Sequence, residues 1–412
     1  MMGRELVRPL EEDWRETLDA LARARGWPSS REVSRLAASV AALSAAYNDA
    51  ARARAPIRDA GAARLGFSFP RDVPKGAAAV RELVATGALQ AGAPVLRVLD
   101  IGAGLGATTW GVVRALAASG ASAAVEATWI DADARALELA SALAQARAGQ
   151  RVGADAGGGN VALRATTVTR TLGPFDDLPR FDLVLVGQVL SELDVGTPDA
   201  ARAERHAALL SGWLDRRVEP HGSLVVIEPA LRDRSRHLHR VRDALVASGA
   251  TVFAPCLHAA PCPALARETD WCHEDVPVDL PPWLVPVARA AGLRREGLTF
   301  SYVVLRKDGV GLQGGAVPIA ASATRLRVVS SAIRSKGKLE AFLCGELESA
   351  GTRVVGRERT MRLDRDATPA NAAWDRLARG DVLTIDPAPE LGRPRIVRGG
   401  SVDGDRPSGE WR

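Results

Sequence analysis

The stretch VLRVLDIGAGLG at 95–106 combines residue types that can bind a small charged ligand. An apolar run leads into Asp100, and three glycines then alternate with small or apolar residues, namely Gly102, Gly104 and Gly106. Glycine lets a backbone pass close under a ligand and adopt conformations that a side chain forbids. A buried strand, this turn and a helix over 107–119 would form the opening unit of a nucleotide-type α/β site.

The spacing also restricts which nucleotide could bind. D-x-G-x-G-x-G differs from the dinucleotide fingerprint G-x-G-x-x-G, and no Lys-Ser/Thr of a phosphate-binding loop follows. Asp100 would repel a phosphate but suits a cationic ligand. A second apolar strand ends in Asp131, 25 residues after Gly106, where a carboxylate can accept hydrogen bonds from ribose hydroxyls. The pattern is similar to the S-adenosylmethionine site of class I methyltransferases and favours a cofactor site over an inert turn.

A third candidate is the segment GQVLSEL at 187–193, which follows the fourth expected strand. It lacks the Asn/Asp-Pro-Pro-aromatic motif of methyltransferases that act on exocyclic base nitrogens. It also has no cysteine for covalent attack on a base. Gln188 could contact the cofactor or a substrate, or it could cap a helix. The sequence identifies no catalytic residue.

The four cysteines form a second candidate site. Three lie within 17 residues of a proline-rich stretch after the sixth expected strand, and one lies far downstream: Cys256, Cys262, Cys272 and Cys344. Thiols so close in sequence can converge on one ion without a large loop-closure cost. Four thiolates suit an iron–sulfur cluster or tetrahedral zinc, and the residues alone leave both metals open. The alternative is four unrelated buried cysteines.

Alternating strand and helix patterns between 91 and 307 must position these residues. They predict an α/β domain with a doubly wound, seven-stranded sheet of the class I methyltransferase type, its last strand antiparallel. The expected strands are Val95–Asp100, Val125–Ile130, Val161–Ala165, Phe181–Val186, Ser223–Glu228, Thr251–Ala254 and Thr299–Leu305.

Flanking segments complete the predicted organisation. Residues 1–90 read as a helical N-terminal cap, interrupted by an irregular loop at 67–75. A cysteine-rich insert at 255–298 belongs to the 91–307 domain. A linker at 308–322 leads to a small β-rich domain at 323–388, and a disordered tail is expected at 389–412. The glycine-rich segment 153–160 is expected to be a surface loop.

The composition indicates a mildly basic protein. Lys and Arg number 54 against 49 Asp and Glu, a net charge of +5 that is compatible with RNA. No apolar run of roughly 18 residues occurs, and the N-terminus is too acidic for a signal or transit peptide. We therefore expect a cytoplasmic, monomeric protein without a membrane segment. The arginines at 232–242 would form a solvated helix face or, alternatively, a surface that contacts phosphates.

The chain resembles the methyltransferase-like family of small-ribosomal-subunit proteins, whose eukaryotic members act in mitochondrial ribosome assembly. The resemblance covers about residues 67–386. It is carried by DIGAGLG at 100–106, FDLVLVGQVLSEL at 181–193, GSLVVIEP at 222–229, APCLHAAPCP at 254–263, DWCH at 270–273, FSYVVL at 300–305 and KGKLEAFLC at 336–344. The first motif is generic to class I methyltransferases, whereas the cysteine set is distinctive.

The resemblance implies a cofactor, a metal centre and a partner. Members of the family resemble one another in holding a [4Fe–4S] cluster on four cysteines, which here would be Cys256, Cys262, Cys272 and Cys344. The implied function is an S-adenosylmethionine-dependent methyltransferase acting on the rRNA of the small ribosomal subunit. One alternative is a non-catalytic assembly factor that binds RNA with a degenerate methyltransferase fold. The other is a zinc-stabilised methyltransferase of small molecules.

Overall fold

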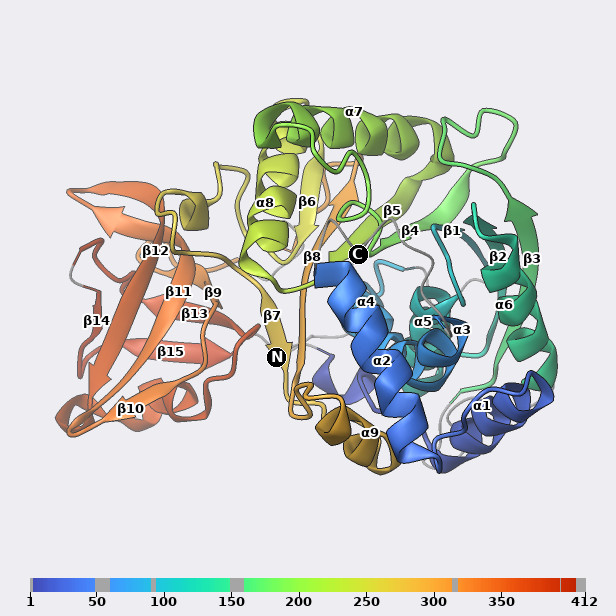
Figure 1. Ribbon diagram of the computed structural model, residues 1–412. Helices are drawn as coiled ribbons and strands as arrows, with labels where there is room; N and C mark the ends of the chain where they lie inside the picture. The colour runs from blue at the N-terminus through green and yellow to red at the C-terminus, as the bar shows by residue number, and fades with distance from the viewer. Residues whose placement is uncertain are drawn as a thin grey trace.

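The computed structural model describes residues 3–48, 60–89, 94–148, 159–312, 318–392 and 394–404. The expected surface loop at 153–160, the linker at 308–322 and the tail after 389 fall partly outside these ranges. Figure 1 shows an α/β core and, beside it, a β-rich domain drawn in orange and red. Among the described residues, no helix is both long and apolar enough to cross a membrane.

The core sheet has the predicted class I methyltransferase topology. Its strand order is β3-β2-β1-β4-β5-β8-β6, and β8 runs antiparallel to both of its neighbours. The bounds are β1 Val95–Ile101, β2 Ala123–Asp131, β3 Val161–Thr169, β4 Phe181–Gly187, β5 Val218–Glu228, β6 Thr251–Ala254 and β8 Leu298–Arg306. One unpredicted short strand, β7 (Glu274–Val276), pairs with the start of β8. The predicted fold class is therefore confirmed.

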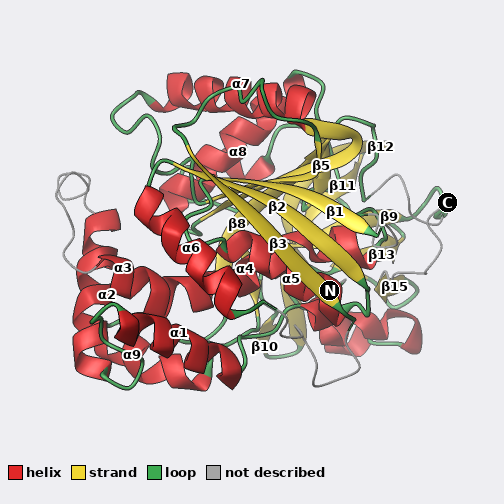
Figure 2. Cartoon of the chain, turned by 90° about the vertical axis from the view of Figure 1, so that its right-hand side faces the viewer, coloured by secondary structure: helices red, strands yellow, loops and turns green. Residues whose placement is uncertain are grey.

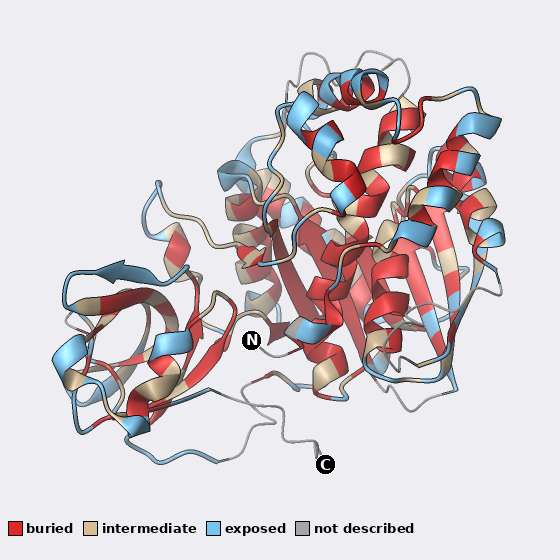
Figure 3. Ribbon diagram, turned by 90° about the horizontal axis from the view of Figure 1, so that it is seen from below, coloured by how far each residue is buried: buried red, intermediate tan, exposed pale blue. Residues whose placement is uncertain are grey.

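Helices cover both faces of this sheet (Figure 2). One face packs against α4 (Phe69–Ala85), α5 (Ala107–Ala118) and α6 (Ala134–Ala146), and the other against α7 (Asp199–Arg217) and α8 (Arg232–Ala247). Side chains of β1 alternate between the two hydrophobic cores: Val98 joins the first and Leu99 the second. Figure 3 shows the buried strands between the partly exposed helices.

The N-terminal segment is helical, as predicted. It contains α1 (Glu12–Ala24), α2 (Val33–Asn48) and α3 (Ala60–Ala63), and a π-helical turn at Arg64–Ser68 leads straight into α4. The prediction of an irregular loop at 67–75 is wrong. Pro70 sits in the first turn of α4, where its missing N–H costs nothing, and Pro74 is accommodated inside the helix.

The C-terminal domain is a second sheet with the order β14-β12-β11-β9-β13-β15, and β10 pairs with β11. Its strands are β9 Thr324–Val328, β10 Ile333–Ser335, β11 Lys338–Ser349, β12 Thr352–Leu363, β13 Val382–Asp386, β14 Arg395–Ile396 and β15 Ser401–Gly404. Trp374 fills its core and donates from Nε1 to the Leu339 carbonyl at 3.1 Å. The last two strands fall in the segment expected to be disordered. They are ordered because β14 pairs with β12 and β15 with β13, burying Ile396 and Val402.

Candidate functional site

The glycine turn after β1 is anchored to the end of β2. The backbone N–H groups of Gly102 and Ala103 both donate to the Ile130 carbonyl, at 2.8 and 3.0 Å. Gly102, Gly104 and Gly106 all have positive φ (69°, 53° and 75°), which an L side chain adopts only with strain. Gly102 and Gly104 line a cleft above the strand ends. Gly106 lies behind it as the N-cap of α5, so it shapes the turn.

Asp100, predicted to bind the cofactor, is buried and does not line the cleft. Its side chain is 1% exposed, and Oδ2 accepts from the Thr109 hydroxyl at 2.7 Å and the Thr109 N–H at 3.3 Å. Thr109 in turn accepts from Trp129 Nε1 at 3.0 Å. Burial raises the pKa of Asp100 to about 7, against the lowering effect of Thr109. Asp100 therefore braces β1 and β2 on the first turn of α5.

Asp131 lies at the cleft, as predicted. Oδ2 accepts from the Gly104 N–H at 2.8 Å, and Oδ1 accepts from the Asp133 N–H at 2.9 Å. Asp133 caps α6 and also pairs with Arg64 at 3.1 Å. A carboxylate has about four lone-pair sites, so Asp131 keeps capacity for a ligand hydroxyl.

Gln188 also lies at the cleft, and its side chain contacts a helix that precedes β1. Nε2 donates to Asp72 Oδ2 at 3.1 Å, and Asp72 Oδ1 pairs with Lys75 Nζ at 2.6 Å. Gln188 has a φ of 61°, held by its N–H donating to Ile227 O at 2.6 Å. Burial is the largest cause that lowers the pKa of Lys75, partly offset by Asp72. The sequence analysis left Gln188 open and did not find Asp72 as a site residue, because the contact joins residues 116 positions apart.

The cleft encloses about 950 Å³. That is at the upper end of ligand pockets, roughly 300–1,000 Å³. Its floor is formed by the strand-end residues above, and the Asp72–Lys75 pair stands on one wall. Close packing of α4 on α5 places that wall: a Cβ on Gly111 would lie 2.4 Å from Val73 O, so only glycine allows this approach.

Glu228, at the end of β5, is a buried carboxyl beside the cleft to which the sequence analysis gave no role. It is 1% exposed and accepts from the Leu190 and Ser191 N–H groups at 2.9 and 3.2 Å. Burial raises its pKa to about 7, and these hydrogen bonds oppose the shift. Glu228 thus fixes the loop that carries Gln188.

The four cysteines come from two domains, as the sequence analysis expected. Cys256, Cys262 and Cys272 follow β6, and Cys344 lies on β11; all four are half-buried. Cys344 Sγ lies 3.7 Å from His258 Nε2 in the cysteine loop. Burial raises the pKa of Cys344, and the three other thiols raise it further. The β-rich domain therefore brings its thiol up to the cysteine loop.

Across the described ranges, no three or more His, Cys, Asp or Glu side chains form a group that could hold a metal ion. Burial also raises the pKa of the other thiols, that of Cys272 to about 11, and neighbouring thiols raise the pKa of Cys262 and Cys272 further. Neither the predicted iron–sulfur cluster nor zinc is therefore shown on these cysteines.

Arginines of α8 hold the cysteine loop in place. Arg236 donates to three carbonyls of this loop, those of Ala264, Arg267 and Asp270, at 2.6–3.0 Å. Arg242 donates to the carbonyls of His258 and Ala260. These two side chains therefore belong neither to a solvated face nor to a phosphate-contacting surface.

Buried charges join the two domains. Arg327 on β9 pairs across the junction with Glu82 on α4 at 2.5 Å and with Glu274 on β7 at 3.4 Å, and Arg81 on α4 pairs with Glu274 within the core at 2.6 Å. The Tyr302 hydroxyl donates to Glu82 Oε2 at 2.8 Å. All five side chains are less than 6% exposed. Each carboxylate is compensated by an arginine, as buried charges require.

Comparison with known proteins assigns the family. A family model described as mitochondrial small ribosomal subunit Rsm22 matches residues 85–377, well over half of the chain. The chain belongs to the Rsm22 family. It is a methyltransferase-like protein of a family described as small-ribosomal-subunit proteins, which confirms the resemblance found in the sequence.

Other comparisons are more distant. A search of curated proteins finds no match. Similar solved structures include a precorrin-6y methyltransferase from Geobacter metallireducens, with 17% identity over 55% of this chain and 88% of that one and a TM-score of 0.28. A methyltransferase from Pyrococcus furiosus has 13% identity over 52% and 75%, with a TM-score of 0.29. The fibrillarin pre-rRNA processing protein of Methanococcus jannaschii has 12% identity over 52% and 68%, with a TM-score of 0.27.

Proposed function

We propose that the cleft binds S-adenosylmethionine and that this Rsm22-family protein methylates RNA of the small ribosomal subunit. The observation that carries the proposal is the cleft of about 950 Å³ over the glycine turn, with Asp131 at the end of β2. When bound, the cofactor supplies an electrophilic methyl group on a sulfonium. Family membership supports a ribosomal partner.

The chain's own residues match the two polar ends of this cofactor. Asp131, which already accepts from the Gly104 N–H, would also accept hydrogen bonds from the ribose hydroxyls. Gly104 leaves room for the ligand because it has no side chain and no atom lies within 4 Å of its Cβ position. The Asp72–Lys75 pair offers one carboxylate and one ammonium to the zwitterionic amino-acid end. Gln188 would keep Asp72 oriented through its Nε2 donation.

Isothermal titration with S-adenosylmethionine tests the proposal. We expect a Kd below about 100 μM, or roughly 5 kcal/mol or more of binding free energy. Asp131→Ala should weaken binding about tenfold, because hydrogen bonds to a charged group contribute roughly 1.5–3 kcal/mol. Asp199→Ala is the matched control, since that exposed carboxylate pairs with Arg240 outside the cleft. Equal affinities for the wild type and Asp131→Ala would refute the assignment.

Methyl transfer itself needs a separate test. Purified protein with labelled cofactor should label RNA in immature small subunits, and Asp131→Ala should label it several-fold less at a cofactor concentration near the wild-type Kd. The second candidate function is a non-catalytic assembly factor. The presence of a β-rich domain that buried charges hold to the core favours this function. Tight binding to immature subunits without label transfer would select that function.

An iron–sulfur cluster on Cys256, Cys262, Cys272 and Cys344 is a further part of the proposal, and it rests on the family resemblance. The approach of Cys344 to the cysteine loop supports it, while the lack of a ligand group in the described residues opposes it. Iron and sulfide analysis of anaerobically purified protein decides between the cluster, zinc and no metal. Cys344→Ser should abolish any bound iron if all four thiols are ligands.

A further inference from the structure

Arg71, on the first turn of α4, stands out among the cationic residues of the cleft. Arg64, Arg170 and Arg234 each donate to a carboxylate or carbonyl, of Asp133, Asp177 and Tyr47 respectively. The half-buried guanidinium of Arg71 has no such acceptor within the part of the chain that the structure describes. Its neighbour is the Phe67 ring, 6.0 Å from Cζ to the centroid. Its donors are therefore available to a ligand.

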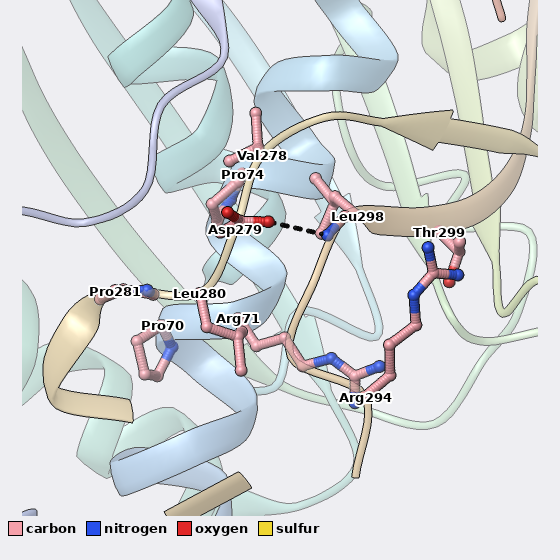
Figure 4. Close-up of a pocket in the computed structure, with 11 residues that line it drawn as sticks. Pro70, Arg71, Pro74, Val278, Asp279, Leu280, Pro281, Arg294, Leu298 and Thr299 are labelled. Atoms are coloured by element: carbon pink, nitrogen blue, oxygen red, sulfur yellow. Dashed lines mark hydrogen bonds between the residues drawn. The ribbon is translucent and has the colours of Figure 1, made fainter. Parts of the chain in front are cut away.

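A shallow hollow lies beside the cleft and shares Arg71, Arg294 and Thr299 with it. Figure 4 shows the hollow between the prolines of α4 and the segments 278–281 and 294–299, with the Arg71 side chain extending toward Arg294 and the Arg294 side chain toward Thr299. Its volume is about 10 Å³, room for no more than about one water. It is therefore too small to hold a base or a cofactor. It matters because it adjoins the cleft, with which it shares three lining residues.

Arg294 is held in position at this outlet. Nη2 donates to Asp275 Oδ2 at 3.1 Å and Nε donates to the Glu296 carbonyl at 2.6 Å, while the side chain stays 52% exposed. A guanidinium has five N–H donors, so it keeps free donors on its exposed side. Two guanidiniums from separate segments thus border the same opening.

We propose that Arg71 and Arg294 form a phosphate-binding subsite where single-stranded RNA enters the cofactor cleft. The inference rests on the proposed function and identifies the side from which the RNA methyl acceptor would enter the cleft. Guanidinium groups bind phosphate oxygens through charge-assisted hydrogen bonds. Lys75, one turn along α4, already has Asp72 as its partner, whereas Arg71 has no anion among the described residues. A phosphodiester at Arg71 and Arg294 would satisfy these donors and place the next nucleotide at the methyl donor.

Binding of a fluorescent single-stranded RNA octamer to the full chain tests the subsite. Arg71→Gln and Arg294→Gln should each raise its Kd about threefold to tenfold, as removal of a partly exposed charge does. The slope of log Kd against log salt should fall by about 0.7 for each phosphate that the variant no longer neutralises. An octamer with neutral methylphosphonate linkages should bind wild type weakly and not distinguish the variants. Arg205→Gln, an exposed arginine on α7, is the control and should bind as wild type does.

Titration with S-adenosylmethionine in parallel separates this inference from the proposed function. Unchanged cofactor affinity together with weaker RNA binding in both variants supports the subsite. Unchanged RNA affinity overturns it, and a loss of cofactor affinity in Arg71→Gln would instead assign Arg71 to the carboxylate of the cofactor. If the wild type binds RNA through these arginines but does not bind the cofactor, the proposed function fails and the phosphate subsite stands. Competition by a nucleoside monophosphate as strong as that by the octamer would indicate a small phosphorylated acceptor and contradict RNA entry.

Discussion

The cofactor cleft and the junction with the β-rich domain both depend on buried charges, but their partners differ in distance along the chain. Around the glycine turn, Asp100 accepts from Thr109, nine residues away, and Asp131 accepts from Gly104, 27 residues away. At the junction, Arg81 and Glu274 are 193 residues apart, and Arg327 and Glu82 are 245 apart. The glycine-turn side of the cleft is built within one strand–turn–helix–strand unit, and the junction only when the whole chain has folded.

This difference assigns distinct energetic roles. Short-range contacts of the cleft stabilise a local backbone conformation that the glycines already permit. Junction contacts hold two domains together, and removal of one arginine leaves two buried carboxylates to share the other arginine. The junction should therefore dominate stability, whereas the cleft should dominate ligand affinity.

The largest expected effect is at the junction. Arg327→Met should lower the free energy of unfolding by about 3–5 kcal/mol, because Glu82 would stay buried beside an apolar side chain. Urea unfolding of the full chain measures it. Arg97→Gln is the control: this 45% exposed side chain pairs with Asp182 and Glu219, and its loss should cost about 1 kcal/mol or less. A similar cost for the two variants would remove the distinction between the regions.

Two glycines of the turn should behave differently. A Cβ on Gly106 would lie 2.7 Å from the fully buried Trp129 ring, whereas a Cβ on Gly104 meets no atom within 4 Å. Gly106→Ala should destabilise the protein by about 2–4 kcal/mol, through overpacking added to positive-φ strain. Gly104→Ala should cost only about 1–2 kcal/mol of strain. Thermal unfolding of the two variants measures which one is less stable. If Gly104→Ala were the less stable, the Trp129 side chain would have moved to accommodate the added methyl group.

A further effect is a pH dependence from the buried Asp100 beneath the glycine turn. Burial raises the pKa of Asp100 from 3.8 to about 7, so the folded state holds the proton more tightly than the unfolded chain does. Its contribution to stability is therefore fully present below about pH 4 and is lost as the pH rises to about 7. The slope is at most about 1.4 kcal/mol per pH unit for one proton. Asp100→Asn keeps an acceptor for Thr109 and should flatten the fall of unfolding free energy over this range. An unchanged pH profile would show that Asp100 is already ionised in the fold.

The sequence by itself determined the core sheet and the positions of its glycine turn. The apolar runs and their glycine or acidic ends mark where strands stop, and the carboxyl ends of parallel strands meet at one edge. That local pattern was sufficient to place Gly102, Gly104 and Asp131 at the cleft. It could not distinguish a carboxylate at the cleft surface, such as Asp131, from a buried one, such as Asp100.

Only the tertiary structure decided what lies across the cleft and between the domains. Asp72 and Lys75 lie at the cleft because Gly111 lets α5 pack closely on α4. The local sequence FPRDVPK contains no signal that predicts this packing. The arginines of α8 were ambiguous in sequence because a guanidinium serves equally well for water, phosphate or a loop carbonyl. Arg236 and Arg242 bind carbonyls of the cysteine loop because the fold brings that loop to α8, and a partner fixed by folding has no signature in the local sequence.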